Sequence, residues 1–162
     1  METLLVENSI TEAPVPVSKI AQRKGARIHA DALEGDLSGF LFRDASQAVI
    51  GVNTSHSSAR QNFTIAHELG HLLLHDQEQL HVDREFRVRL RSDVSSQGTD
   101  EAEQEANLFA ASLLMPKAFI ERDLEEDIDI IDDDDCRLLA RRYGVSNQAF
   151  AIRLKTLGYI QE

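Results

Sequence analysis

The chain has 162 residues, of which 42% are hydrophobic, and its formal net charge at neutral pH is −11. This length is typical of one domain with its own buried core, and the single cysteine, Cys136, excludes an internal disulfide. The negative charge argues against direct binding of nucleic acid, which needs a concentrated basic surface. The sequence shows no signal peptide and no apolar run long enough to span a bilayer, so we expect a cytoplasmic protein without a membrane segment.

The N-terminal part is predicted to hold little regular structure before a short helix. Residues 1–17 contain two prolines and are expected to form an irregular lead-in to a single domain over residues 18–162. A short helix is predicted over residues 18–24, with Ser18 as its N-cap and Gly25 just past its end.

Three short strands are predicted next. Runs of β-branched and aromatic residues place them at residues 27–31, 37–43 and 47–53, and the stretch from Asp44 to Ser46 suits a tight hairpin turn. The third strand is expected to form an edge of the sheet, where it could align an extended peptide by strand addition.

The most informative stretch is the predicted helix over residues 63–74. At about 100° per residue, His67 and His71 lie within about 40° of each other on one helix face, so both imidazoles can reach one metal ion. Glu68 lies beside them, where its carboxylate can take a proton from a water bound to the ion. The pattern predicts metal-assisted hydrolysis. A third ligand elsewhere in the chain is needed to support a metal site, because two surface histidines can also fall four residues apart by chance.

His75 lies one turn further along the same helix face. In a straight helix it is about 12 Å from His67, too far for both to share an ion with bonds near 2.0 Å. We therefore expect His75 to be a hydrogen-bonded, partly buried histidine. The remaining histidines have no spacing that indicates a ligand: His29, His56 and His81.

The third ligand is expected on a second helix, over residues 101–115. On a helical projection Glu103 lies beside the apolar face while Glu105 points away, so Glu103 is the better ligand and Glu105 is the alternative. Alanines three and seven residues after Glu103 would let this helix pack closely against the first. Asn107 can hydrogen-bond the outer nitrogen of a ligating histidine. An ordinary acidic first turn, favoured by the helix dipole, is the other explanation of these glutamates.

Two polar segments flank this second helix. Residues 77–97 are hard to assign. Alternating apolar and basic residues at 86–91 fit a half-buried strand with one basic face, and we favour a solvated strand or loop over a rim that touches substrate. Residues 121–135 include ten acidic side chains, which predicts a solvated turn or, alternatively, a docking surface for a basic partner.

The C-terminal part is predicted to be helical. One helix is expected over residues 117–125, and two more over 135–143 and 146–157, joined at Gly144 and shaped like a helix-turn-helix. Because the chain is acidic, we interpret this pair as structural, or as a wall of the site, rather than as a reader of DNA.

Several of these stretches together resemble the ImmA/IrrE family of zinc peptidases. They are residues 36–40, 50–53, 63–71 and 103–116, and the stretch 143–159 is similar to the last helices of that family. The resemblance extends from about residue 17 to residue 160. It implies a gluzincin-like endopeptidase, and such proteins often act on a repressor with a helix-turn-helix DNA-binding domain, in mobile elements or in stress responses.

Residue by residue, the resemblance implies His67 and His71 as zinc ligands, Glu103 as the third ligand and Glu68 as the general base. Asn107 then stands where some gluzincins have an acidic residue behind a ligating histidine. We therefore expect a zinc cofactor, with manganese as the alternative. The expected partner is a protein substrate, a helix-turn-helix repressor on a separate chain.

The predicted fold is α+β, with a small antiparallel three-stranded sheet packed on a helical metallopeptidase core and followed by C-terminal helices. The predicted function is zinc-dependent hydrolysis of a peptide bond in such a repressor. A regulatory binding module that docks on a repressor without cutting it, or that acts like an antitoxin, is the main alternative. Hydrolysis of a non-peptide substrate is a further one. Tyr143 and His75 are both candidates for stabilising the oxyanion, and their spacing does not decide between them.

Overall fold

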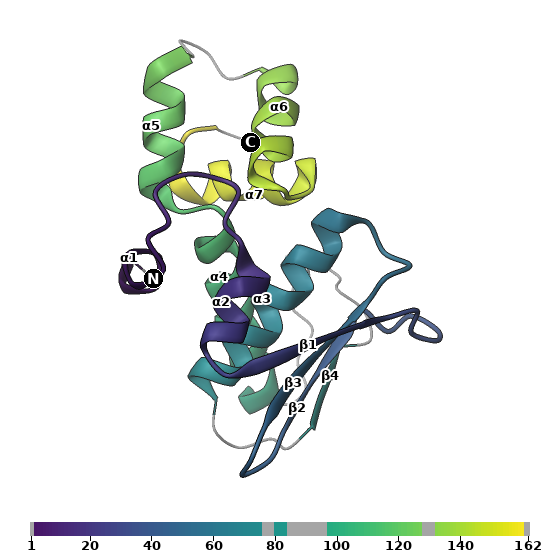
Figure 1. The fold of residues 1–162 in the computed structure, drawn as a ribbon. Coiled ribbons are helices and arrows are strands. Elements are labelled where there is room, and N and C mark those ends of the chain that lie inside the picture. The colour runs from purple at the N-terminus through teal and green to yellow at the C-terminus, as the bar shows by residue number, and fades with distance from the viewer. Residues whose placement is uncertain (1, 76–79, 84–96, 128–131, 161–162) are drawn as a thin grey trace.

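A computed structural model describes residues 2–75, 80–83, 97–127 and 132–160 of the chain. The helices are α1 (Glu2–Glu7), α2 (Val17–Arg23), α3 (Ser58–Leu74), α4 (Gln97–Leu114), α5 (Lys117–Asp127), α6 (Asp133–Tyr143) and α7 (Asn147–Leu157). The strands are β1 (Ala26–Asp31), β2 (Gly39–Arg43), β3 (Ala48–Asn53) and β4 (Leu80–Asp83). The sheet lies on one side of α3, and α5, α6 and α7 gather at the other end of the molecule (Figure 1).

The observed sheet differs from the predicted one, although the α+β class is confirmed. It is a mixed sheet of four strands in the order β1-β3-β2-β4, so the expected antiparallel sheet of three strands is wrong. The chain reverses after β1 and again at the predicted hairpin, where Asp44 Oδ1 accepts hydrogen bonds from the backbone N–H groups of Ser46 and Gln47. After two reversals β3 runs in the direction of β1 and inserts between β1 and β2.

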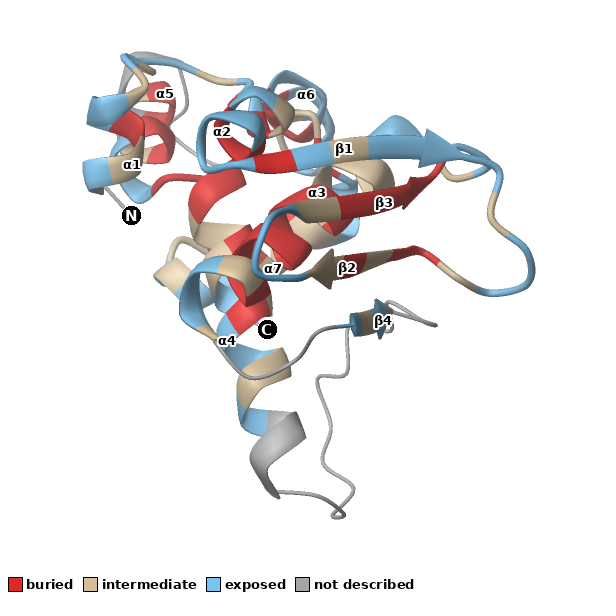
Figure 2. Ribbon diagram, turned by 60° about the horizontal axis from the view of Figure 1, so that its bottom comes forward, coloured by how far each residue is buried: buried red, intermediate tan, exposed pale blue. Residues whose placement is uncertain are grey.

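The expectation that residues 47–53 form a sheet edge is also wrong. β3 is an interior strand, and its residues from Ile50 to Asn53 are buried, because this is the strand whose apolar side chains pack on α3 (Figure 2). Among the described strands, β1, which is mostly exposed, and β4 are the outer members of the sheet.

β4 is a short strand inside the segment that was hard to assign. Four residues are too few for a periodic pattern to stand out from a polar background. β4 pairs antiparallel with β2, and His81 lies opposite Leu41, which is buried. The predicted strand over residues 86–91 lies outside the described residues.

The N-terminal residues are more ordered than the predicted lead-in. Residues 2–7 form α1, and Leu5 is buried in the core together with Val15, so apolar contacts hold this segment although its prolines interrupt regular structure. α2 begins at Val17, with Pro16 at the N-cap position and no side-chain cap, so the expected cap by Ser18 is wrong.

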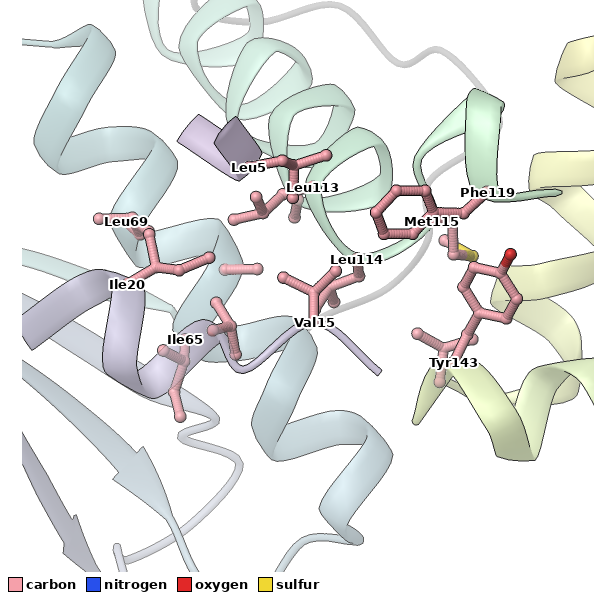
Figure 3. Packing of buried hydrophobic residues seen from close by; sticks show 14 of the residues in the cluster. Leu5, Val15, Ile20, Ile65, Leu69, Leu113, Leu114, Met115, Phe119 and Tyr143 are labelled. Carbon is pink, nitrogen blue, oxygen red and sulfur yellow. The ribbon is translucent and has the colours of Figure 1, made fainter. Parts of the chain in front are cut away.

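The core lies where α2, α3 and α4 meet under the sheet. Figure 3 shows Ile20, Ile65 and Leu69 next to one another, with Leu113 and Leu114 of α4 beyond them. α3 and α4 pack closely along each other, as predicted: Ala106 and Ala110 are fully buried, and the backbone of Ala106 leaves little room for a side chain at Gly70. This contact sets the distance between the two helices that carry the site.

The C-terminal helices α6 and α7 pack against each other. α6 ends at Gly144 in the left-handed conformation, and Ser146 caps α7 by accepting a hydrogen bond from Ala149, so the predicted pair of helices with a tight turn is confirmed. Buried Asp123 of α5 accepts a hydrogen bond from the Tyr143 hydroxyl at 2.8 Å. This bond ties α5 to α6.

The replacement Ala106→Leu tests the helix contact. Because Ala106 is fully buried against α3, the larger side chain must push α3 and α4 apart, and we expect thermal unfolding to show a loss of about 1 to 3 kcal/mol in stability. Leu108→Ala, at an exposed position on the same helix, is the control and should change stability little. Equal stability of Ala106→Leu and the wild type would contradict the close packing.

Candidate metal centre

α3 buries three ionisable side chains, His67, Glu68 and His71. The helix starts at Ser57, whose hydroxyl accepts a hydrogen bond from the Arg60 N–H, and its apolar residues face the core. His67 is 1% exposed and Glu68 is 0% exposed, and His71 is also buried. The Nε2 atoms of His67 and His71 lie 3.0 Å apart.

α4 brings one carboxylate to these histidines. Glu103 Oε2 lies 3.3 Å from His67 Nε2, and Glu103 Oε1 lies 3.3 Å from His71 Nε2. Glu105 is exposed and instead places Oε2 3.8 Å from His75 Nε2. The structure therefore gathers Glu103, rather than Glu105, with the two histidines.

Asn107 lies behind His67. Its Oδ1 atom is 3.0 Å from His67 Nδ1, and an amide oxygen can only accept, so the imidazole donates its Nδ1–H. A neutral His67 then presents the lone pair of Nε2 toward His71 and Glu103.

His81 of β4 is a member of the site that the sequence pattern did not indicate. Its Nε2 lies 2.7 Å from Glu103 Oε1, its Nδ1 lies 3.1 Å from Glu68 Oε2, and its ring stacks on that of His71 with centroids 3.9 Å apart. The local signal was the alternation of Leu80, His81 and Val82, which turns the histidine to the face opposite its two apolar neighbours. That signal is usable only once β4 is known to be a strand beside β2.

The charges of these protein groups shift one another's pKa values. Burial opposes the charged form of Glu103, but contacts with His67, His71 and His81 outweigh it and hold the pKa of this carboxyl far below its usual range. Burial opposes the charged form of His81 as well, yet its contacts with Glu103 and Glu68 raise the pKa of His81 to about 10. Burial lowers the pKa of His71. The cluster thus favours a charged Glu103 carboxylate next to a positively charged His81.

The arrangement fits a divalent metal ion. One nitrogen or oxygen from each of His67, His71, His81 and Glu103 lies within 4.8 Å of the others. Bonds near 2.0 Å to a four-coordinate zinc put neighbouring ligand atoms about 3.3 Å apart, close to the separations of His67 and His71 from Glu103. In addition, Glu68 Oε1 is buried and has no hydrogen-bond partner among the described residues.

The two residues considered for the oxyanion lie outside this group. The Tyr143 hydroxyl is bound to Asp123 among the C-terminal helices (Figure 3 shows Tyr143 beside Met115 and Phe119). His75 is partly buried, as predicted, but its Nε2 has no hydrogen-bond partner within the part of the chain that is described.

Comparison with known proteins places the chain in a family. The family model of the IrrE N-terminal-like domain, Peptidase_M78, matches residues 21–155. The chain belongs to this family. The assignment confirms the resemblance to ImmA/IrrE proteins and makes the His67, Glu68 and His71 helix part of a peptidase domain.

The fold of this Peptidase_M78 chain also occurs in a larger protein. A Mycobacterium tuberculosis transcriptional regulator matches 97% of the chain with a TM-score of 0.66 and 20% sequence identity, and the chain spans 45% of that regulator. No curated protein matches the sequence. No helix among the described residues combines the length and apolarity needed to cross a membrane.

The pair Glu103→Gln and Glu105→Gln distinguishes the two candidate ligands on α4. Loss of the Glu103 charge should weaken zinc binding by at least about 100-fold, as a zinc site prefers a carboxylate to an amide, whereas Glu105→Gln should bind zinc like the wild type. Competition with a zinc-chelating dye measures both. The opposite ranking would identify Glu105 as the ligand.

The role of Asn107 can be tested in the same assay. Asn107→Ala removes the acceptor behind His67, and loss of such a partner costs about 10-fold to 100-fold in metal affinity. Asn107→Asp keeps an oxygen in that place and should retain most of the affinity. If both variants bind zinc like the wild type, the bond to His67 Nδ1 does not orient a ligand.

Proposed function

We propose that the chain is a metal-dependent endopeptidase. The observation that carries the proposal is the position of Glu68, a fully buried carboxylate whose Oε2 lies 3.1 Å from Nδ1 of His81, one of the four residues that could hold a metal ion. A buried base beside a candidate metal site is the combination that metal-assisted hydrolysis of a peptide bond uses. Membership of a peptidase family supports it.

Each side chain has a defined task in this proposal. Zinc, or manganese, when held by His67, His71 and Glu103, would supply Lewis-acid polarisation of the scissile carbonyl and of the attacking water. Glu68 takes the proton from that water and delivers it to the nitrogen of the leaving amine. Asn107 keeps His67 in the tautomer that offers Nε2 to the site.

The sheet supports a peptide as the substrate. β4 pairs with β2 and is the last strand of the sheet within the described part of the chain, and it carries His81 into the group of site residues. An extended peptide that adds to β4 would therefore pass the site with its backbone aligned.

We further propose a helix-turn-helix repressor as the substrate, cleaved in the cytoplasm. The resemblance to ImmA/IrrE proteins supports this class of substrate. The matching transcriptional regulator shares the fold, and its name supports a regulatory setting.

The function is tested with purified protein, zinc or manganese, and purified helix-turn-helix repressors from the same organism as candidate substrates. Wild-type protein should produce discrete fragments, detected by gel and intact mass, while Glu68→Gln should bind the metal normally and release none, a loss of at least about 1000-fold in rate. Cleavage by Glu68→Gln would contradict the assigned base. Tight binding of a repressor without fragments, with either metal, would support the non-cleaving binding module.

A further inference from the structure

His81 lies between the two groups that hydrolysis uses. Its Nε2 approaches Glu103 Oε1 at 2.7 Å and its Nδ1 approaches Glu68 Oε2 at 3.1 Å, so one imidazole contacts both a candidate ligand and the candidate base. The side chain faces the site because His81 shares the inner face of the sheet with Leu41 and Ile50.

A catalytic zinc site keeps one coordination position open, whereas a site with four protein ligands is closed. His67, His71 and Glu103 would leave that fourth position free. His81 supplies a further nitrogen in the same group, with all four ligand atoms within 4.8 Å of one another.

The second nitrogen of His81 strengthens the case for ligation. A histidine that binds metal through one ring nitrogen usually donates the other N–H to a carboxylate or carbonyl. With Nε2 directed to the ligand group, Nδ1 donates to Glu68 Oε2, which supplies that partner. A metal ion would displace the proton that His81 otherwise holds, and the Glu68 and Glu103 side chains would then face the charge of the ion instead.

We propose that His81 is a fourth protein ligand and that the resting site is closed. This inference rests on the proposed metal site and extends it: as a ligand, His81 would take the coordination position that a catalytic site leaves open for water, and its contact with Glu68 would engage the base, so the resting chain would be latent. Cleavage then requires His81 to turn away from the metal.

The position of His81 makes this movement feasible. His67 and His71 are buried on α3, but His81 is on a four-residue strand that is the outermost of the described strands, and its neighbours Leu80 and Val82 are 56% and 39% exposed. A rotation of the His81 side chain, or a small shift of β4 when a peptide pairs with it, would open the site without disturbing the helix contact. Substrate binding at β4 would thereby be coupled to activation.

Zinc K-edge X-ray absorption of the full zinc-loaded chain tests the ligand set without any substrate. The wild type should show three imidazoles and a carboxylate, and His81→Ala should show two imidazoles with a light oxygen donor in place of the third. His29→Ala, at an exposed position of β1, is the matched control and should keep all three. Two imidazoles in the wild type would overturn the proposal, whether or not the variant folds.

A second experiment measures whether the metal site has an open coordination position, with cobalt in place of zinc and azide as an external ligand. Azide should change the visible spectrum of the His81→Ala protein at a concentration at least about 10-fold lower than it needs in the wild type, because only the variant has an open position. Equal azide binding in the two proteins would contradict a closed site. Neither readout uses cleavage, so a failure of the proposed peptidase activity would be recognised separately.

Discussion

The close contact between α3 and α4 is the constraint on which the site depends. Small residues, Gly70 on α3 and Ala106 on α4, let the two helices approach until the Glu103 carboxylate lies 3.3 Å from both histidine nitrogens. The sheet and α2 cover the other side of α3 and bury its apolar residues. The core therefore affects the site through the distance that it sets between α3 and α4.

The charges of the buried ionisable side chains in the site must be balanced by nearby opposite charges. Glu68 and His67 are nearly inaccessible to solvent, and an unpaired charge in such surroundings is costly. Within the described part of the chain, His81 contacts both carboxylates, and a divalent ion would supply the same positive charge more compactly.

Local patterns predicted the parts of the site that lie on helices. The spacing of His67, Glu68 and His71 needs only the helical period, and a projection was sufficient to choose Glu103 over Glu105 as the residue facing them. Patterns could not predict which strands become neighbours. The position of β3 inside the sheet and the parallel pairing of β1 depend on how the chain returns after the hairpin, and His81 was missed because β4 is defined only by its partner β2.

The most direct test of the central claim is a crystal of the zinc-loaded protein measured with X-rays at the zinc absorption edge. Our account predicts one strong anomalous peak about 2.0 to 2.2 Å from His67 Nε2, His71 Nε2 and a Glu103 carboxylate oxygen. A strong peak elsewhere, or none between α3 and α4, would contradict it.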